Sequence, residues 1–252
     1  MKVTVLFKNQ LRQIDFLKPL HISLPVQFEE RGVNAFYLDE PVFAPFRAGN
    51  FVGSVTEGGA CNCEVITLSP HGNGTHTECI GHISRERITI HDSLKEYNFF
   101  ARLITVVPES INDDNIITKE ILVKAFKNNP LLKESTALII RTNPNELLKT
   151  SRKYSGTNPI YIEPKAMAEI VALGVEHLLV DFPSVDREED SGLLKSHHIF
   201  WQYPAAPRMQ ATITELIYVP DEIPDGDYFL QMQIAPLESD ASPSKPVLYE
   251  IV

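Results

Sequence analysis

A succession of strand, helix and strand between Ala137 and Phe182 constrains the fold more than any other stretch of the sequence. Ala137–Arg141 (ALIIR) is a short apolar run rich in β-branched residues, which is typical of a buried strand. An acidic residue and a proline then open a helical segment at 163–173 (EPKAMAEIVAL), and Gly174 ends it. The apolar run HLLVDF at 177–182 follows directly. This order predicts an α/β unit.

Further elements follow the same reasoning. Leu103–Val107 (LITVV) predicts a buried strand, and the partial alternation in Tyr228–Ala235 predicts a half-exposed one. Thr118 can cap a helix over 119–128, whose apolar residues fall on one face. Before residue 100 the chain is rich in turns and mostly extended. We therefore predict an α/β fold with a large β contribution.

Composition limits the domain count and the partners. The 252 residues are 43% hydrophobic, and neither a low-complexity linker nor an internal repeat divides them, so we expect one domain over 1–252. The net charge of -10 argues against binding to nucleic acid or to an anionic membrane. We expect a cytoplasmic protein, because no apolar run has the length of a membrane span and no signal peptide opens the chain. An odd number of cysteines (Cys61, Cys63 and Cys79) fits a reduced compartment.

The stretch SPHGNGTHTECIGHIS, from Ser69 to Ser84, concentrates chemically active side chains. On an extended segment His76 and Glu78 point to the same side, and His82 can return to them after a turn at Gly81. An imidazole and a carboxylate that converge are suited to a divalent cation. The alternative is a Gly/Asn turn whose histidines only form ordinary hydrogen bonds.

A catalytic metal site draws ligands from distant parts of a chain, and two downstream segments offer them. One is the pair His197 and His198, and the other is Glu215. Taken alone, the histidine pair is equally explained as surface residues beside an aromatic run, and Glu215 as a solvated residue at a strand end.

Several segments together resemble the putative cyclase family, which includes bacterial kynurenine formamidase. GTHTECIGH resembles the family signature H-x-G-T-H-x-D-x-P-x-H. Other segments are similar to further family motifs in the same order, and the resemblance extends from about His21 to the C-terminus. These segments are HISLPV at 21–26, LLVDFPSVDREED at 178–190, SHHIFW at 196–201 and TELIYVPDEIPDGDYFLQMQIAPLE at 214–238.

The resemblance implies a metal site and a fold. His76 and His197 match ligand histidines, with His198 as a neighbouring possibility, and Glu215 matches a ligand glutamate. Glu78 stands at the signature aspartate, which in the family can bridge two metal ions. His82 matches the histidine thought to act as general acid and base. The implied fold is a swivelling β/β/α domain, in homodimers or larger homo-oligomers.

The chain departs from the signature at several positions. Gly72 stands where the first signature histidine is expected, and His71 lies one residue too early to reach the site unless the loop bulges. Ile80 replaces the signature proline, and Cys79, beside the site, is interpreted as a packing residue. With one ligand fewer, we expect one tightly bound ion and a weak or absent second one. On this view His71→Ala changes metal affinity little, and Gly72→His restores the second site if the backbone accepts a side chain.

These observations predict a metal-dependent hydrolase of an amide, formamide or ester-like bond, similar to an arylformamidase of tryptophan catabolism to kynurenine. Its small-molecule substrate would be attacked by a metal-activated water, with His82 as proton shuttle. Imidazole and carboxylate ligands favour zinc, with manganese as the rival. Trp201 and Arg208 are candidate substrate-pocket residues, although Arg208 is equally well explained as a surface arginine. The alternatives are a non-catalytic metal or ligand binder, and a cyclase or dehydratase.

Overall fold

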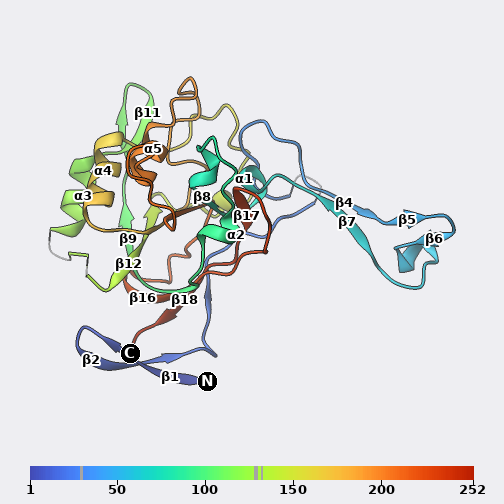
Figure 1. The fold of residues 1–252 in the computed structure, drawn as a ribbon, viewed down its shortest axis with the longest axis horizontal. Helices are drawn as coiled ribbons and strands as arrows, with labels where there is room; N and C mark the ends of the chain where they lie inside the picture. Colours follow the sequence, from blue (N-terminus) through green and yellow to red (C-terminus); the bar gives the residue numbers. More distant parts are fainter. Residues whose placement is uncertain (29–30, 128–129, 132) are drawn as a thin grey trace.

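The structure, a computed structural model, describes residues 1–28, 31–127, 130–131 and 133–252 (Figure 1). The strands are β1 Lys2–Phe7, β2 Gln10–Asp15, β3 Leu20–His21, β4 Val42–Pro45, β5 Arg47–Ala48, β6 Phe51–Val52, β7 Glu64–Thr67, β8 His76–Cys79, β9 Asn98–Val106, β10 Glu109–Ile111, β11 Asp114–Ile117, β12 Ser135–Thr142, β13 Tyr161–Ile162, β14 His177–Val180, β15 Thr212–Glu215, β16 Gly226–Gln231, β17 Ala241–Pro243 and β18 Val247–Glu250. The α-helices are α1 Pro70–Asn73, α2 Ile90–Ser93, α3 Lys119–Phe126, α4 Pro164–Ala172 and α5 Lys195–Trp201. Short 3₁₀ helices cover Val55–Glu57, Ile80–His82 and Leu147–Thr150.

A nine-stranded mixed sheet forms the body of the molecule, in the order β17-β8-β15-β14-β12-β9-β16-β18-β3. Its four central strands β15, β14, β12 and β9 are parallel to one another. The flanking strands pair antiparallel with them, β8 with β15 and β16 with β9. The carboxyl ends of the parallel strands therefore share one edge. Ligand sites of α/β sheets lie at such edges.

Alternating side chains on the central strands bury both faces of the sheet. On β12, Leu138 and Ile140 pack with α3, α4 and α5 in one apolar cluster, whereas Ala137 and Ile139 face the opposite cluster. The latter cluster contains Ile90 from α2. Each face of the sheet is thus covered, as the apolar composition of its strands requires.

The predicted α/β fold is confirmed, and most elements fall close to their expected positions. β12 and β14 are parallel, as a strand-helix-strand unit requires. Thr118 accepts a hydrogen bond from the Ile121 amide at the start of α3, and Gly174 follows α4 with a positive φ of 82°. The helix predicted over 119–128 ends at Phe126, and the last residue of that prediction lies outside the described residues. The strand predicted over Tyr228–Ala235 instead covers Gly226–Gln231.

Outside the nine-stranded sheet, β10, β11 and β13 form a three-stranded sheet, and two further β segments lie apart from it in the described part of the chain. The paired strands β4 and β7 form the base of an arm, residues 42–67, which extends away from the sheet and carries β5 and β6 (Figure 1). At the other side, the hairpin of β1 and β2 lies beside the C-terminus, where Gln13 and Val252 exchange backbone hydrogen bonds of 2.7 and 3.0 Å. Across the described ranges, none of the helices is both long and apolar enough to cross a membrane.

Candidate metal centre

Two paired strands place the first candidate ligands. β8 runs antiparallel to β15, so that His76 lies opposite Glu215 and Glu78 lies two residues further along the same strand. All three residues are buried, and His76 Nε2 lies 3.4 Å from Glu215 Oε2. The extended segment predicted for His76 and Glu78 is confirmed by β8, which directs both side chains to the same side of the sheet.

His197 reaches the same point from the first turn of α5. Its Nε2 lies 3.2 Å from Glu78 Oε1 and 4.0 Å from Glu215 Oε1. Its Nδ1 lies 2.7 Å from Asp186, which also accepts hydrogen bonds from the backbone amides of Ser196 and His197. A single carboxylate thereby fixes both the start of α5 and the orientation of the imidazole ring.

Asp186 has no role in the sequence-based prediction, although it closes the segment LLVDFPSV that precedes it. Its importance depends on the loop that returns it to α5, ten to eleven residues later in the chain. The only signal in the sequence is a carboxylate within a motif shared with the family. Spacing alone gave no reason to pair Asp186 with His197.

A third group of side chains adjoins Glu78. His71 Nδ1 lies 3.3 Å from Glu78 Oε2, and His82 Nδ1 lies 3.6 Å from the same oxygen. Asp240, which the sequence-based prediction also missed, lies 2.9 Å from His71 Nε2 and 3.3 Å from His82 Nδ1. Glu78 therefore lies between the buried ligands on one side and a half-buried pair of histidines on the other.

The innermost polar atoms lack hydrogen-bond partners. Among the described residues, His76 Nε2, His197 Nε2 and both carboxylate oxygens of Glu78 are buried without one. Buried polar atoms are almost always satisfied, so four unsatisfied atoms that face one another require an explanation. Two imidazole nitrogens and a carboxylate are ligand atoms of zinc and manganese. The residues present therefore fit a divalent metal ion.

The ionisation of the centre also favours a cation. Burial alone would raise the pKa of Glu78, but the His82 and His197 imidazoles hold it well below its usual value. Burial would lower the pKa of His197, yet its hydrogen bond to Asp186 and the neighbouring charge of Glu78 raise it to about 10. In the same way, Asp240 and Glu78 raise the pKa of His71 to about 10. The carboxylates thus stabilise positive charge in the pocket. Protons on the imidazoles provide this charge in the absence of metal, and a metal ion can replace them.

An open cavity of about 450 Å³ adjoins these residues and gives access from solvent. His71, His82, His197 and Glu215 are among its lining residues. The lining also includes apolar and charged side chains, among them Phe36, Leu38, Leu194, Arg187 and Glu188. A small organic molecule of mixed polarity could reach the histidines through it.

The structure corrects the expectation that Gly72 leaves a gap in the ligand set. The short helix α1 directs His71, not residue 72, toward Glu78, and its ring centroid lies 5.2 Å from that of His76. A Cβ on Gly72 would lie 2.7 Å from Leu38 Cδ1 and 2.8 Å from the Ala35 carbonyl oxygen. The helical turn of α1 therefore brings His71 to the centre, as a bulge in the loop would. A histidine at position 72 has no room for its side chain, so Gly72→His cannot restore a ligand.

Three other predicted residues lie elsewhere. His198 Nδ1 donates to the Tyr203 carbonyl at 3.2 Å, and His198 belongs to none of the ligand groups in the described part of the chain. Trp201 is fully buried and stacks on the inner side of His197, with ring centroids 5.6 Å apart. Arg208 donates to the carbonyl groups of Phe200 and Val175. Neither Trp201 nor Arg208 lines the cavity, so the structure does not support them as substrate-pocket residues.

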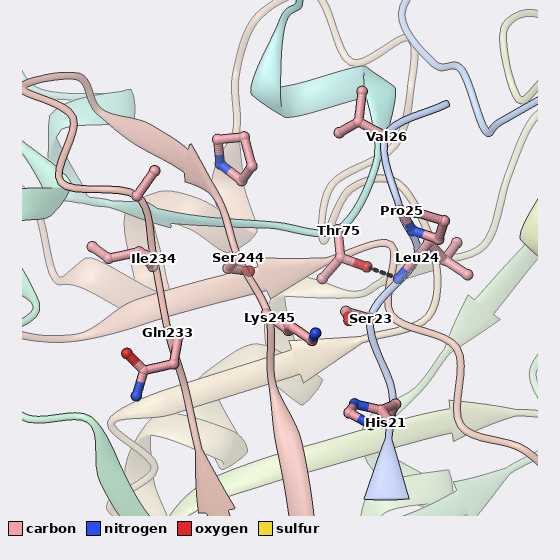
Figure 2. A pocket seen from close by; sticks show the side chains of 12 residues that line it. His21, Ser23, Leu24, Pro25, Val26, Thr75, Gln233, Ile234, Ser244 and Lys245 are labelled. Carbon is pink, nitrogen blue, oxygen red and sulfur yellow. Dashed lines mark hydrogen bonds between the residues drawn. The ribbon is translucent and has the colours of Figure 1, made fainter. Parts of the chain in front are cut away.

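A larger cavity of about 560 Å³ lies beside the centre and contains none of its ligands (Figure 2). Thr75 lines this cavity and directly precedes the proposed ligand His76, so it lies between the cavity and the metal centre. Its hydroxyl accepts from the Leu24 amide at 2.7 Å, as Figure 2 shows, and donates to the Leu216 carbonyl at 2.5 Å. This threonine ties the segment after β3 to the two strands that carry His76 and Glu215.

Comparisons with known proteins identify the family of the chain. The family model of the putative cyclases matches residues 20–187, and the chain therefore belongs to the putative cyclase family. Among curated proteins, none matches the chain.

Solved structures share the fold over most of their length. One is a potential metal-dependent hydrolase with cyclase activity, 16% identical, with a TM-score of 0.63 over 92% of this chain and 98% of that one. Another is a predicted metal-dependent hydrolase from Bacillus stearothermophilus, also 16% identical, with a TM-score of 0.60 over the same shares. A third is isatin hydrolase A from Labrenzia aggregata, bound to benzyl benzoate, 13% identical, with a TM-score of 0.68 over 92% and 93%. At these identities the likeness establishes the fold.

Proposed function

We propose that this protein is a metal-dependent hydrolase that cleaves an amide, formamide or ester-like bond. The observation that carries the proposal is the convergence of His76, Glu78 and His197, whose innermost atoms are buried and have no hydrogen-bond partner in the described ranges of the chain. The hydrolase names of proteins with the same fold support the reaction class. A bound divalent ion would lower the pKa of a water molecule to about 7 and polarise a carbonyl group.

The ligands we propose are His76, Glu78, His197 and Glu215, with zinc as the first candidate ion and manganese as the second. We expect one tightly bound ion, with His71 as an additional ligand beside Glu78 Oε2. The two oxygens of Glu78 face different sides, because Oε1 lies near His197 and Oε2 lies near His71. A second ion on the His71 side is therefore compatible with the geometry. The number of ions bound per chain, measured by titration, decides between one ion and two.

His82 is the proposed proton shuttle. It is half-buried, lines the cavity and lies beside Glu78, so it can reach both the water and the leaving group of a bound substrate. Imidazole suits this role because its ordinary pKa lies near neutrality. His197, by contrast, has no access to this role because both of its nitrogens are already directed at carboxylates.

The substrate we propose first is an N-formyl arylamine, as in the conversion of tryptophan to kynurenine. Phe36 and Leu38 offer apolar contacts for an aromatic ring in the cavity, which is also lined by Arg187, paired with Asp114 at 3.1 Å. Cyclic amides and aryl esters have the same reacting carbonyl and form the rest of the substrate panel.

The arm over 42–67 supports the proposed homo-oligomer. Val42, Val65 and Ile66 are each about half exposed on its base strands, and Phe46 and Phe51 are exposed beyond them. Apolar patches of this kind are typical of protein contacts. Light scattering on the native chain, compared with a chain carrying Val65→Lys and Ile66→Lys, tests whether the arm holds copies together.

The activity experiment uses zinc-loaded protein with an N-formyl arylamine, an aryl ester, a lactone and a cyclic amide. Turnover of at least one of them is expected, and His82→Ala should abolish most of it. His91→Ala, an exposed histidine outside the site, is the matched control and should retain activity. Tight metal binding without turnover of any of these compounds would favour the binding protein or the cyclase/dehydratase instead.

A further inference from the structure

Asp240 is held beside the metal centre by backbone pairing. It directly precedes β17, which pairs antiparallel with β8 so that Ala241 lies opposite Glu78. The Asp240 carbonyl also accepts a hydrogen bond of 3.0 Å from the Cys79 amide. The position of its carboxylate is therefore tied to the strand that carries the proposed ligand Glu78.

One oxygen of this carboxylate serves two histidines. Oδ2 accepts from His71 Nε2 at 2.9 Å and from His82 Nδ1 at 3.3 Å. The other oxygen, Oδ1, accepts from the Ser239 hydroxyl at 3.1 Å. His71 and His82 both line the cavity, and their ring centroids lie 4.5 Å apart.

The other histidines of the centre show the same arrangement with different acceptors. His76 Nδ1 donates to the Gly74 carbonyl at 3.1 Å, and His197 Nδ1 donates to Asp186 at 2.7 Å. In both, the opposite nitrogen, Nε2, faces the centre. An oxygen acceptor of this kind fixes ring orientation and tautomer, and its removal typically weakens metal binding or activity.

The geometry places Asp240 in this role twice. Because His71 Nε2 carries its proton toward Asp240, Nδ1 is the nitrogen that faces Glu78, 3.3 Å away, and it would offer its lone pair to a metal ion bound there. Because His82 Nδ1 carries its proton toward the same oxygen, the lone pair of Nε2 is left free to accept a proton. His82 Nδ1 lies further from Glu78, at 3.6 Å, so Asp240 is its hydrogen-bond partner.

We propose that Asp240 is a positioning residue of this enzyme, which sets the tautomers of both the additional ligand His71 and the proton shuttle His82. The inference rests on the proposed function, since it assigns His82 a proton-transfer role at a metal centre. It adds that the two histidines are coupled through a single carboxylate, and that this carboxylate comes from a segment of the chain remote from the signature.

Nitrogen NMR of the imidazole rings in zinc-loaded protein tests the proposal without reference to activity. Native protein should show His82 with its proton on Nδ1, and His71 with its proton on Nε2. In Asp240→Asn, which keeps the shape of the side chain, the His82 signals should move toward a mixture of the two tautomers. The zinc-free protein gives a second measurement of the His82 tautomer, which does not depend on metal binding.

Kinetics and metal content complete the test. Asp240→Asn should reduce kcat about 10- to 100-fold with little change in KM, and should weaken rather than abolish zinc binding. Asp240→Glu should recover part of the rate, because it retains an acceptor charge. Asp92→Asn removes an exposed carboxylate of α2 and should leave all three measurements unchanged.

Two results would overturn the proposal. One is a native His82 protonated on Nε2, which can be established even if every variant fails to fold. The other is an Asp240→Asn protein with the native His82 tautomer and a kcat within about twofold of native. If native protein binds no zinc or hydrolyses nothing, the proposed function fails, and the His82 tautomer in the zinc-free protein still decides the role of Asp240.

Discussion

Two buried ionic clusters lie at the carboxyl edge of the same sheet, and they differ in how their charges are satisfied. In the first, Lys149 Nζ lies 2.8 Å from Asp181 Oδ2 and also donates to the Thr142 carbonyl. Asp181 in turn accepts from the Thr142 amide at 2.8 Å and the Thr142 hydroxyl at 2.9 Å. In the second, both oxygens of Glu78 and one nitrogen each of His76 and His197 have no hydrogen-bond partner among the described residues.

The difference distinguishes a structural ion pair from a metal centre. The first cluster contains its own cation, Lys149, which is placed with its partners by the short helix after β12. In the second, each ion pair within the described residues joins a carboxylate to an imidazole. A buried charge is tolerated when it is paired, and the second cluster is paired only when an ion or protons enter it.

The largest effect should come from removing ligands of the second cluster. His76→Ala and Glu78→Ala should lose tightly bound metal entirely, because each removes a donor from a small ligand set. Elemental analysis of protein purified without chelator measures this. Lys149→Met is the matched control, since it alters the other buried cluster and should keep the native metal content. Unchanged metal in either alanine variant would contradict the proposed ligands.

Lys149→Met should instead affect stability. It leaves Asp181 buried without its cation, which costs about 3–5 kcal/mol of unfolding free energy. Urea unfolding of zinc-loaded native and variant proteins gives the difference. The double variant Lys149→Met/Asp181→Leu should be more stable than Lys149→Met alone, because no uncompensated charge remains. Equal stability of native protein and Lys149→Met would mean that the first cluster does not act as a structural ion pair.

His82→Ala should separate catalysis from metal binding. We expect normal metal content and melting temperature, and a rate lower by roughly a hundredfold, or about 2.7 kcal/mol. A loss of metal would make His82 a ligand. A lower melting temperature with a normal rate per folded molecule would make it only a packing residue.

Gly72→His tests which residue of α1 faces the centre. A side chain there meets Leu38 and the Ala35 carbonyl, so the variant should lose about 1–3 kcal/mol of stability without binding more metal. Gly72→Ala should show part of the same loss. His71→Ala, by contrast, should weaken metal binding, which reverses the expectation from the sequence. An additional tight ion in Gly72→His would contradict this arrangement of α1.

The smallest effect concerns a buried histidine far from these carboxylates. Burial, together with the charge of Arg208, lowers the pKa of His177 to about 4. The unfolded chain takes up this proton near pH 6.5, so the stability present above that pH should fall progressively toward pH 4, by about 1–2 kcal/mol at pH 5. His177→Gln should lessen this loss in chemical unfolding between pH 7 and 5, and His91→Gln should not. An identical pH dependence in His177→Gln would contradict a buried neutral imidazole.

The sequence predicted those parts of the molecule that depend on local pattern. Apolar runs located β9, β12 and β14, and the spacing of His76 and Glu78 on an extended segment placed both side chains on one side of β8. The downstream residues His197 and Glu215 followed from motif order, and the structure brings them to the same point.

The residues that the sequence did not reveal act through contacts between distant segments. Asp240 reaches His71 and His82 only because β17 pairs with β8, and strand pairing of this kind leaves no periodic signal. The sequence predicts His71 only as a possible additional ligand, because a linear signature cannot show that a single helical turn shifts the position facing the centre. Arg208 was considered for a substrate, yet it is bound to the carbonyl groups of Phe200 and Val175.

Calorimetric titration of chelator-treated protein with zinc shows whether the second cluster is a metal centre. Native protein should bind at least one ion per chain tightly. Binding should release protons, because His197 gives up the proton that its carboxylate neighbours retain, and it should weaken as the pH falls. Lys149→Met should bind zinc as native protein does, and Glu78→Ala should not. Native protein that binds zinc no better than Glu78→Ala would contradict a metal centre at His76, Glu78, His197 and Glu215.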